Sequence, residues 1–405
     1  MSVVRPFRAL RPRPDLAAQV ACLPYDVMST AEAAEMARGN PDSFLHVTRS
    51  EIDLPPDTDE HGEEAYGQAA RALADLRRRG VLAVDDAPCL YLYRLVMGAH
   101  SQTGIVGAFS VEEYDRGLIV KHEHTRPDKE ADRTRHILTL SAQAEPVFLV
   151  HRASPGLTAV VDEAARAAPL YDFTAPDGVR HTLWRVAEPA PLVGAFAALD
   201  RVYIADGHHR AAAASNSRRA LADDGLLSDD HGAHTLLAVS FPADQAQILP
   251  YNRLVEDLAG RSPEAFLGAL RQVAQVSDEP AGPTPEGPGD VRMFLDGRWW
   301  RLGVPPRAQD PVGRLDVSAL QDRVLGPLLR IDDPRTSKRI SFVGGIRGTA
   351  ALEAAVRDGQ AAVAFSLAPV TAEQLLAVAD AGRTMPPKST WFEPKLRSGL
   401  FVNLL

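Results

Sequence analysis

The stretch Val202–Arg210 (VYIADGHHR) decides the fold that we expect, because a short apolar run leads into an Asp-Gly turn and then three basic side chains. The apolar residues at 202–205 are typical of a buried strand. The alanine-rich segment His208–Ala222 that follows is typical of a helix. A strand, a tight turn and a helix in this order are a building unit of layered α/β proteins.

The chemistry of the turn Asp206–Arg210 suits a phosphate group. A helix N-terminus offers free N–H groups and the positive end of the helix dipole, so it attracts anions. Gly207 lets the backbone approach an anion closely, and the His-His-Arg that follows adds donors. Asp206 offers a carboxylate for a divalent cation or a proton. The alternative interpretation is structural, with Asp206 as a helix cap and the histidines on the surface.

A second cluster of charged residues spans Lys121–His136 (KHEHTRPDKEADRTRH). One interpretation is a solvated helix, although its pairs at i,i+4 carry like charges and repel. In the functional interpretation Glu123 is a general base that its basic neighbours keep ionised. A metal site is a further alternative, because His122 and His124 would share one face if they lay on a strand. The spacing of a helical zinc protease site is absent.

A third cluster lies at Met385–Lys395 (MPPKSTWFEPK). Its two adjacent prolines restrict the backbone, and Lys388, Ser389 and Thr390 then present a cation and two hydroxyl groups. Such a loop suits a carboxylate or a phosphate. The alternative interpretation is a proline-rich surface turn.

Composition limits the class of protein. The 405 residues include 44 basic and 53 acidic side chains, for a formal charge of −9, which argues against a protein that coats nucleic acid or an anionic membrane. Two cysteines cannot form a disulfide framework. The first residues resemble no signal peptide, and no apolar run could span a bilayer. We therefore expect a cytoplasmic protein.

The pattern along the chain predicts three parts. We expect an N-terminal extension at 1–120, a central catalytic core at 121–275 and a C-terminal α/β region at 291–405. The segment Val276–Asp290, rich in Pro, Gly and acidic residues, is predicted to be a linker or a long loop. In the N-terminal part, Phe44–Val47 (FLHV) is predicted to be a strand.

The three clusters, in the order in which they occur along the chain, resemble the motifs of two known families. Along its whole length the chain resembles a bacterial family catalogued only as domain of unknown function one-thousand-and-fifteen, which implies no activity. The motifs behind this resemblance are RPFRALRP, YDVMS, NPxSFLHV, KHExT, ADGHHR and MPPKSTWFEPK. The order of His122-Glu123, Asp206–Arg210 and Pro387–Thr390 is similar to that of archaeal free-serine kinases. That similarity implies an α/β (α+β) protein with a ParB/sulfiredoxin-like nucleotide-binding core and an additional C-terminal α/β region.

The resemblance to these kinases implies a role for each site residue. Glu123 would be the base on the acceptor hydroxyl, and Asp206 would act in catalysis as the ligand of Mg²⁺. The groups that would hold the nucleotide, ATP or ADP, are Gly207, His208, His209 and Arg210. The groups on the substrate side would be His122, His124, Lys388, Ser389 and Thr390. The chain departs from the kinases at Ala211, where they have Trp, and at Trp391-Phe392, where they have Arg-His.

The implied function is a nucleotide-dependent kinase that acts on the hydroxyl of serine or of a similar amino or hydroxy acid. Two alternatives stay open. A phosphatase acting on a phosphoserine-type substrate would use related chemistry. A ParB-like nucleotide-binding regulator would need a basic recognition helix, and we find none in the sequence. The expected partners are a nucleotide and a small acid, without nucleic acid or membrane.

Overall fold

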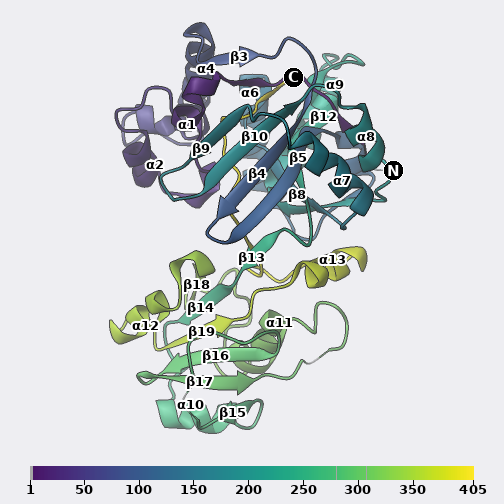
Figure 1. The fold of residues 1–405 in the computed structure, drawn as a ribbon. Coiled ribbons are helices and arrows are strands. Elements are labelled where there is room, and N and C mark those ends of the chain that lie inside the picture. Colours follow the sequence, from purple (N-terminus) through teal and green to yellow (C-terminus); the bar gives the residue numbers. More distant parts are fainter. Residues whose placement is uncertain (1–2, 280, 307) are drawn as a thin grey trace. The chain divides into compact units, whose positions relative to one another are not determined.

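The computed structural model describes residues 3–279, 281–306 and 308–405, and the chain divides into two compact units. The first unit joins Met1–Ala246 to Pro394–Leu405, and the second is Gln247–Glu393. Both units combine helices with a sheet, so the protein is a mixed α/β protein (Figure 1). These boundaries differ from those that we predicted near residues 120 and 275.

The first unit is built on a nine-stranded mixed sheet with the order β6-β11-β8-β12-β5-β4-β10-β9, and β1 pairs with β5. The pairs β6–β11 and β8–β12 are parallel, and the other pairs are antiparallel. Strands from both sides of residue 120 join this sheet, so the N-terminal residues are part of the first unit. The strands are β1 (Val4–Arg5), β4 (Leu90–Met97), β5 (His100–Ser110), β6 (Ile119–Val120), β8 (Val147–His151), β9 (Tyr171–Thr174), β10 (Arg180–Val186), β11 (Val202–Asp206) and β12 (Thr235–Pro242).

The last residues of the chain return to the first unit and run beside its N-terminal segment. Strand β21 (Asn403–Leu404) pairs with β7 (Ala142–Gln143). Isolated bridges join Leu10 to Val402 and Cys22 to Ser398. Another short pair joins β2 (Leu10–Pro12) to β3 (Leu82–Val84). The β21–β7 pair and the two isolated bridges explain why residues 394–405 belong to the first unit.

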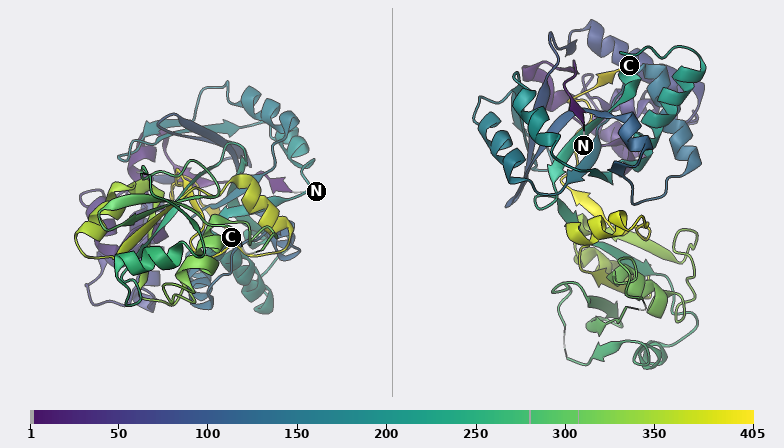
Figure 2. Two further views of the ribbon diagram at one scale, coloured as in Figure 1. Left: turned by 90° about the horizontal axis from the view of Figure 1, so that it is seen from below. Right: turned by 90° about the vertical axis from the view of Figure 1, so that its right-hand side faces the viewer.

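The structure describes nine α-helices in the first unit. These helices flank its sheet (Figure 2). They are α1 (Ala17–Val20), α2 (Thr30–Ala37), α3 (Leu45–Thr48), α4 (Glu63–Arg78), α5 (Val111–Asp115), α6 (Pro127–Leu140), α7 (Pro155–Ala164), α8 (Ala190–Phe196) and α9 (His208–Asp223). Ser29 starts α2 with a capping box, in which its hydroxyl accepts from the Glu32 N–H. The predicted strand at Phe44–Val47 is wrong, because Phe44 is the N-cap of α3 and residues 45–47 lie within this helix. Burial of Phe44 and Val47 in the core beside α4 outweighs their strand propensity.

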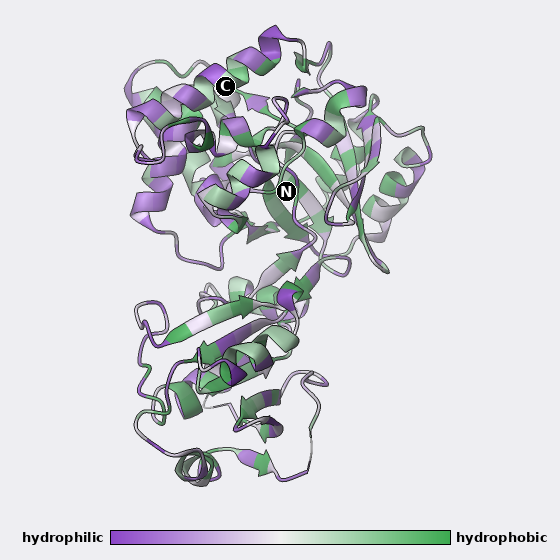
Figure 3. Ribbon diagram, turned by 90° about the vertical axis from the view of Figure 1, so that its left-hand side faces the viewer, coloured by the Kyte–Doolittle hydropathy of each residue, from purple (hydrophilic) through white to green (hydrophobic). Residues whose placement is uncertain are grey.

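Packing of α9 on α6 positions the turn that we singled out. The alanines at 211–214 are buried, and their small side chains let the two helices approach closely. Strands of both units are largely hydrophobic, whereas the helices carry many hydrophilic residues (Figure 3). Within the described ranges, no helix combines the length and the apolar character needed to cross a bilayer.

The second unit is built on an antiparallel six-stranded sheet with the order β15-β17-β16-β19-β14-β18. The predicted linker at 276–290 lies mostly between β15 and β16 of this sheet, so it is a long loop within the unit; Pro280 lies outside the described residues. The strands of this sheet are β14 (Tyr251–Val255), β15 (Gln275–Ser277), β16 (Asp290–Leu295), β17 (Arg298–Gly303), β18 (Ile340–Gly344) and β19 (Val363–Leu367). A separate antiparallel pair joins β13 (Gln247–Leu249) to β20 (Trp391–Glu393). The helices are α10 (Pro263–Leu270), α11 (Asp316–Leu320), α12 (Ala350–Arg357) and α13 (Ala372–Asp380).

Candidate functional site

Two loops of the first unit meet because the strands before them are parallel neighbours. In the sheet, Val120 of β6 is paired with Tyr203 of β11. The chain therefore leaves both strands at the same edge of the sheet. One strand leads into the loop 121–126, and the other leads into the turn at the start of α9. Ligands of α/β proteins commonly bind at this edge, beyond the carboxyl ends of the strands.

The turn after β11 has the strand–turn–helix form that we predicted. Gly207 adopts a φ of +95°, in the left-handed region that favours glycine, and α9 begins at the next residue. A Cβ atom at this position would lie 2.9 Å from Arg210 Nε. Only part of the turn faces solvent, because His208 and Arg210 are buried while Asp206 and His209 are half-buried. The alternative of a capping aspartate with surface histidines is wrong, since Asp206 makes no cap and His208 is buried.

Lys395 is the partner of Asp206, and the sequence analysis missed it. Its Nζ lies 3.0 Å from Asp206 Oδ2, while Arg210 Nη2 lies 3.7 Å from Oδ1. Burial acts to raise the pKa of Asp206, but the positive charges of Lys395 and Arg210 outweigh it and hold that pKa well below its ordinary value. Asp206 is therefore an ionised carboxylate at neutral pH. Lys395 lies in the MPPKSTWFEPK motif, which marked this segment as functional, but we predicted Lys388 of the same motif as the site lysine.

Glu123 and His122 lie in the loop after β6, next to His208. The Oε2 atom of Glu123 lies 3.5 Å from His208 Nδ1, and the Glu123 side chain is 53% exposed. The rings of His122 and His208 meet edge to face, with centroids 4.5 Å apart. Burial lowers the pKa of His122 to about 4, and burial together with His122 lowers the pKa of His208 far below its usual value. Both imidazoles are therefore neutral at pH 7.

His124 does not share a face with His122, so that part of the metal hypothesis is wrong. The segment is a loop, in which His122 is buried and His124 is exposed. His209 lies elsewhere on the turn, where its Nε2 accepts a hydrogen bond from the Arg126 N–H at 3.1 Å. Burial lowers the pKa of His209. This bond connects the start of α9 to the start of α6.

The second half of the charged cluster is a helix with a buried side. Pro127 occupies the first turn of α6, where its missing N–H costs nothing. Asp132 accepts hydrogen bonds from Tyr66 at 2.7 Å and from Arg133 at 2.8 Å. His136 is also buried, and its Nε2 lies 3.0 Å from the Val47 carbonyl oxygen. Asp132 and Arg133 thus pair with each other on the buried side of this helix, whereas Asp128 is exposed and pairs with Arg126, so the interpretation as a solvated helix holds for one side of the segment only.

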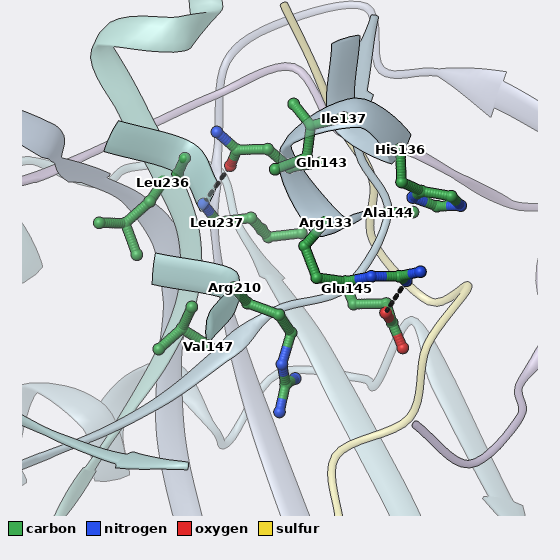
Figure 4. A pocket seen from close by; sticks show the side chains of 11 residues that line it. Arg133, His136, Ile137, Gln143, Ala144, Glu145, Val147, Arg210, Leu236 and Leu237 are labelled. Atoms are coloured by element: carbon green, nitrogen blue, oxygen red, sulfur yellow. Dashed lines mark hydrogen bonds and ion pairs between the residues drawn. The ribbon is translucent and has the colours of Figure 1, made fainter. Parts of the chain in front are cut away.

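The guanidinium of Arg210 is directed into the interior rather than toward solvent. It donates to the carbonyl of Pro146 and lines a small pocket with Arg133 and Glu145 (Figure 4). Arg133 Nη1 lies 3.9 Å from Glu145 Oε2. Burial acts to lower the pKa of Arg210, but Asp206, Asp26 and Glu145 together raise it. Arg210 therefore links the turn to an internal charge cluster and stays protonated.

Glu145 contacts residues from three separate parts of the chain at this cluster. Its Oε1 accepts from the Tyr25 N–H at 3.2 Å and from the Ser398 hydroxyl at 2.8 Å. Tyr25 belongs to the YDVMS motif, and the Arg133 guanidinium lies 4.1 Å from its ring centroid. Burial raises the pKa of Glu145. No local pattern in the sequence singles out Glu145, because its partners come from residues far away along the chain.

Lys388, Ser389 and Thr390 belong to the second unit. Lys388 has a φ of +56°, its carbonyl accepts from Arg253 Nη2 at 3.1 Å, and its Nζ lies 5.5 Å from the Tyr251 ring centroid. The Ser389 hydroxyl is buried and donates to the Pro386 carbonyl at 2.5 Å. Ser389 also lines a small pocket with Arg253. Arg253 is buried, and this burial lowers its pKa to about 9.

The described part of the first unit thus brings together Glu123, His122, His208 and the Asp206–Lys395 pair at the start of a helix. This arrangement offers an exposed carboxylate, an ionised carboxylate beside cations, and the N–H groups of the first turn of α9. Those groups can accept a proton, bind a cation and bind an anion, respectively.

Comparisons with known proteins identify relatives. A family model described as Protein of unknown function (DUF1015) matches residues 4–318. No curated protein matches the chain. Several solved structures are similar to the chain, and three of them serve as examples. A conserved hypothetical protein from Pyrococcus furiosus has 13% identity and a TM-score of 0.37, and the match covers 74% of this chain and 95% of that chain. A free serine kinase in complex with AMP has 11% identity and a TM-score of 0.36, with 73% and 92% covered, and SbnI with C-terminal truncation from Staphylococcus aureus has 14% identity and a TM-score of 0.38, with 74% and 87% covered.

Proposed function

Since the chain belongs to the family described as Protein of unknown function (DUF1015), we propose its activity from the site itself: it is a nucleotide-dependent kinase that phosphorylates the hydroxyl of serine or of a similar amino or hydroxy acid. One observation is the main support. The exposed carboxylate of Glu123 lies 3.5 Å from His208, the first residue of the 16-residue helix α9. A potential base and an anion-binding helix start are therefore neighbours. The order of the motifs, which is similar to that of free-serine kinases, supports the same activity.

In this proposal the N-terminus of α9 holds the phosphates of ATP or ADP. The first N–H groups of a helix have no partner within the helix and can donate to phosphate oxygens. The left-handed Gly207 before them leaves no side chain between backbone and ligand. His209 is half-buried and adds a polar side chain at the rim. Arg210 acts at a distance, as a buried positive charge that favours an anion at the turn.

Glu123 is the base of the proposed reaction. The acceptor O–H bond breaks, its proton passes to the Glu123 carboxylate, and the oxygen forms a bond to the terminal phosphorus of the nucleotide. The bond from that phosphorus to the bridging oxygen breaks, which releases a nucleotide with one phosphate fewer. A carboxylate suits this step because the hydroxyl becomes acidic only as the new bond forms.

Asp206 fits the proposed Mg²⁺ by donor type, since Mg²⁺ takes carboxylate and phosphate oxygens. Its Oδ2 accepts a hydrogen bond from Lys395, and its Oδ1 makes a longer contact of 3.7 Å with Arg210. When bound there, Mg²⁺ would neutralise charge on the phosphates. The side chain of Lys395 adds a positive charge at the same carboxylate, so we assign it a role in positioning Asp206.

The predicted acceptor contacts of Lys388, Ser389 and Thr390 stay a separate proposal. Ser389 is engaged within its own loop, so Lys388 and Thr390 are the better candidates to bind the substrate carboxylate. If Lys388 binds the acceptor, K388M raises KM for the acceptor more than it lowers kcat. We also propose a cytoplasmic location, which agrees with the free thiols of Cys22 and Cys89.

The experiment is a panel of reactions followed by phosphorus NMR. ATP and ADP are each mixed with Mg²⁺, the full-length protein and one of several hydroxylated amino or hydroxy acids. The expected result is a phosphate-ester resonance that needs nucleotide, acceptor and enzyme together. Inorganic phosphate released from phosphoserine without nucleotide would establish a phosphatase instead. No transfer to any acceptor, with CTP-dependent DNA binding in a gel shift, would establish a ParB-like regulator.

A further inference from the structure

We propose that the first unit binds a divalent transition-metal ion of the Zn²⁺ or Co²⁺ type through His122, Glu123 and His208. The inference is independent of the proposed kinase activity, because it rests on the donor atoms alone. It also differs from the proposed Mg²⁺ ligand, Asp206, whose carboxylate contacts Lys395 and Arg210.

The geometry of the three side chains suits a single ion. One ligand atom from each, a ring nitrogen or a carboxylate oxygen, lies within 4.8 Å of the other two. Around a tetrahedral ion with ligand bonds of about 2.1 Å, donor atoms are roughly 3.4 Å apart. The observed Glu123 Oε2 to His208 Nδ1 distance of 3.5 Å is already close to this separation. Glu123 is exposed and lies in a loop, so its side chain can close the remaining gap.

Three buried ring nitrogens of this cluster make no hydrogen bond of good geometry with any described residue. Neither ring nitrogen of His122 makes a hydrogen bond of good geometry, and His208 Nε2 also lacks one. His122 is only 2% exposed and His208 only 5%, so water does not compensate either ring. Buried polar atoms are nearly always hydrogen-bonded in folded proteins. Two adjacent imidazoles with such nitrogens can both serve as ligands of one ion.

The donor set selects the class of ion. Two imidazoles and one carboxylate form a combination that zinc enzymes use, and imidazole suits Zn²⁺, Co²⁺ and Ni²⁺. Mg²⁺ prefers oxygen ligands and six-fold coordination, so it fits this set poorly. Three protein ligands would leave a coordination position for water or a substrate oxygen. Because Glu123 is also the proposed base, an ion in this site would compete with that role.

The experiment uses the full-length protein without a polyhistidine tag, stripped by a chelator and then titrated with Co²⁺. Visible absorption of Co²⁺ reports the ligand geometry, and calorimetry with Zn²⁺ gives the affinity and the stoichiometry. We expect one ion per chain that a large excess of Mg²⁺ does not displace. H122Q, H208Q and E123Q should each weaken binding by at least about tenfold, since even loss of a group that only orients a ligand costs that much.

The control variants separate this site from its neighbours. H124Q removes an exposed histidine two residues from His122 and should bind Co²⁺ as the wild type does. K395M alters the partner of Asp206 and should also leave Co²⁺ binding unchanged, even if it abolishes kinase turnover. Circular dichroism checks the fold of each variant, and if the buried histidine variants misfold, the exposed E123Q decides. Absence of binding, or wild-type affinity in E123Q and in any folded histidine variant, would overturn the proposal.

Discussion

Lys395 Nζ lies 3.0 Å from Asp206 Oδ2, although 189 residues separate the two in sequence. The contact joins the returning C-terminal segment to the end of strand β11. It is a charge-assisted hydrogen bond at a site where Lys395 is 11% and Asp206 28% exposed. The last residues of the chain therefore set the charge of the turn that begins α9.

Replacing Lys395 tests the energetic value of this pair. K395M keeps the length of the side chain but removes its charge, so Asp206 loses the shorter of its two described ion pairs and keeps the longer contact to Arg210. We expect the free energy of unfolding to fall by about 1–2 kcal/mol at pH 7, which is the range for a charged hydrogen bond at a partly exposed site. Urea denaturation measures this change. K388M is the matched control, because Lys388 is exposed, and wild-type stability in K395M would contradict the prediction.

Because the first unit buries several histidines, we predict that it loses stability in mild acid. His151 is 2% exposed, its Nδ1 lies 2.8 Å from the Ser240 hydroxyl, and burial lowers its pKa to about 4. The unfolded chain binds this proton near pH 6.5, so the stability that neutral His151 contributes is lost as pH falls from about 6.5 to 4. His122, His136, His181 and His208 have lowered pKa values for the same reason.

The variant H151N tests this linkage. Without the titrating imidazole, the decline of unfolding free energy with falling pH should be shallower by up to about 1.4 kcal/mol per pH unit inside that window. Urea denaturation at pH 7, 6 and 5, with a chelator present, gives the slope. The idea is wrong if the wild type and H151N lose stability in parallel.

Local patterns in the sequence were sufficient to predict the strand, the turn and the helix around Asp206. Strand β11, the left-handed Gly207 and α9 follow from apolar residues, a glycine and a run of alanines, each acting over a few positions. The strand predicted at 44–47 failed because tertiary packing of three apolar residues, Phe44, Leu45 and Val47, decided the backbone of this segment.

The partners within the site could not be predicted, because they come from distant parts of the chain. Lys395 stands in a motif that we had quoted, but nothing local distinguishes it from Lys388 as the lysine that reaches Asp206. Glu145 has no pattern around it at all, and its role follows only from contacts with Tyr25, Arg133 and Ser398. Charge pairs across long sequence separations depend on the strand order, which a single sequence does not specify.

The backbone of the turn provides a third prediction. Alanine at Gly207 would have to adopt a φ of +95°, and its Cβ would lie 2.9 Å from Arg210 Nε. We expect G207A to lower the free energy of unfolding by at least about 1–2 kcal/mol, the cost of left-handed backbone for a residue with a Cβ. Thermal and urea unfolding measure this loss.

The control for G207A is G194A in helix α8. Gly194 is exposed, has no positive φ, and a Cβ there would meet nothing within 4 Å. Alanine is a better helix former than glycine, so G194A should gain about 0.5–1 kcal/mol. Equal effects of the two substitutions would contradict the conformational argument.

The final prediction separates the roles of the two carboxylates in the proposed kinase. E123Q and D206N each keep the shape of the side chain and remove its charge. Both should lose turnover by roughly 10²-fold or more, because one removes the base and the other the proposed Mg²⁺ ligand. Nucleotide affinity distinguishes them. D206N should weaken binding of the Mg²⁺-nucleotide, whereas E123Q should leave it nearly intact, because a base acts mainly in the transition state.

Calorimetry with a non-hydrolysable nucleotide and Mg²⁺ measures the nucleotide affinity. Initial rates with the acceptor that phosphorus NMR identifies measure the turnover. D206N also removes the anion that Lys395 contacts, so its unfolding free energy must be compared with that of K395M. If D206N and K395M lose similar stability but only D206N loses much affinity for the Mg²⁺-nucleotide, Asp206 takes part in nucleotide binding in addition to pairing with Lys395. Full activity of E123Q on the true acceptor would remove Glu123 as the base, and its carboxylate would then be free to serve only as a ligand beside His122 and His208.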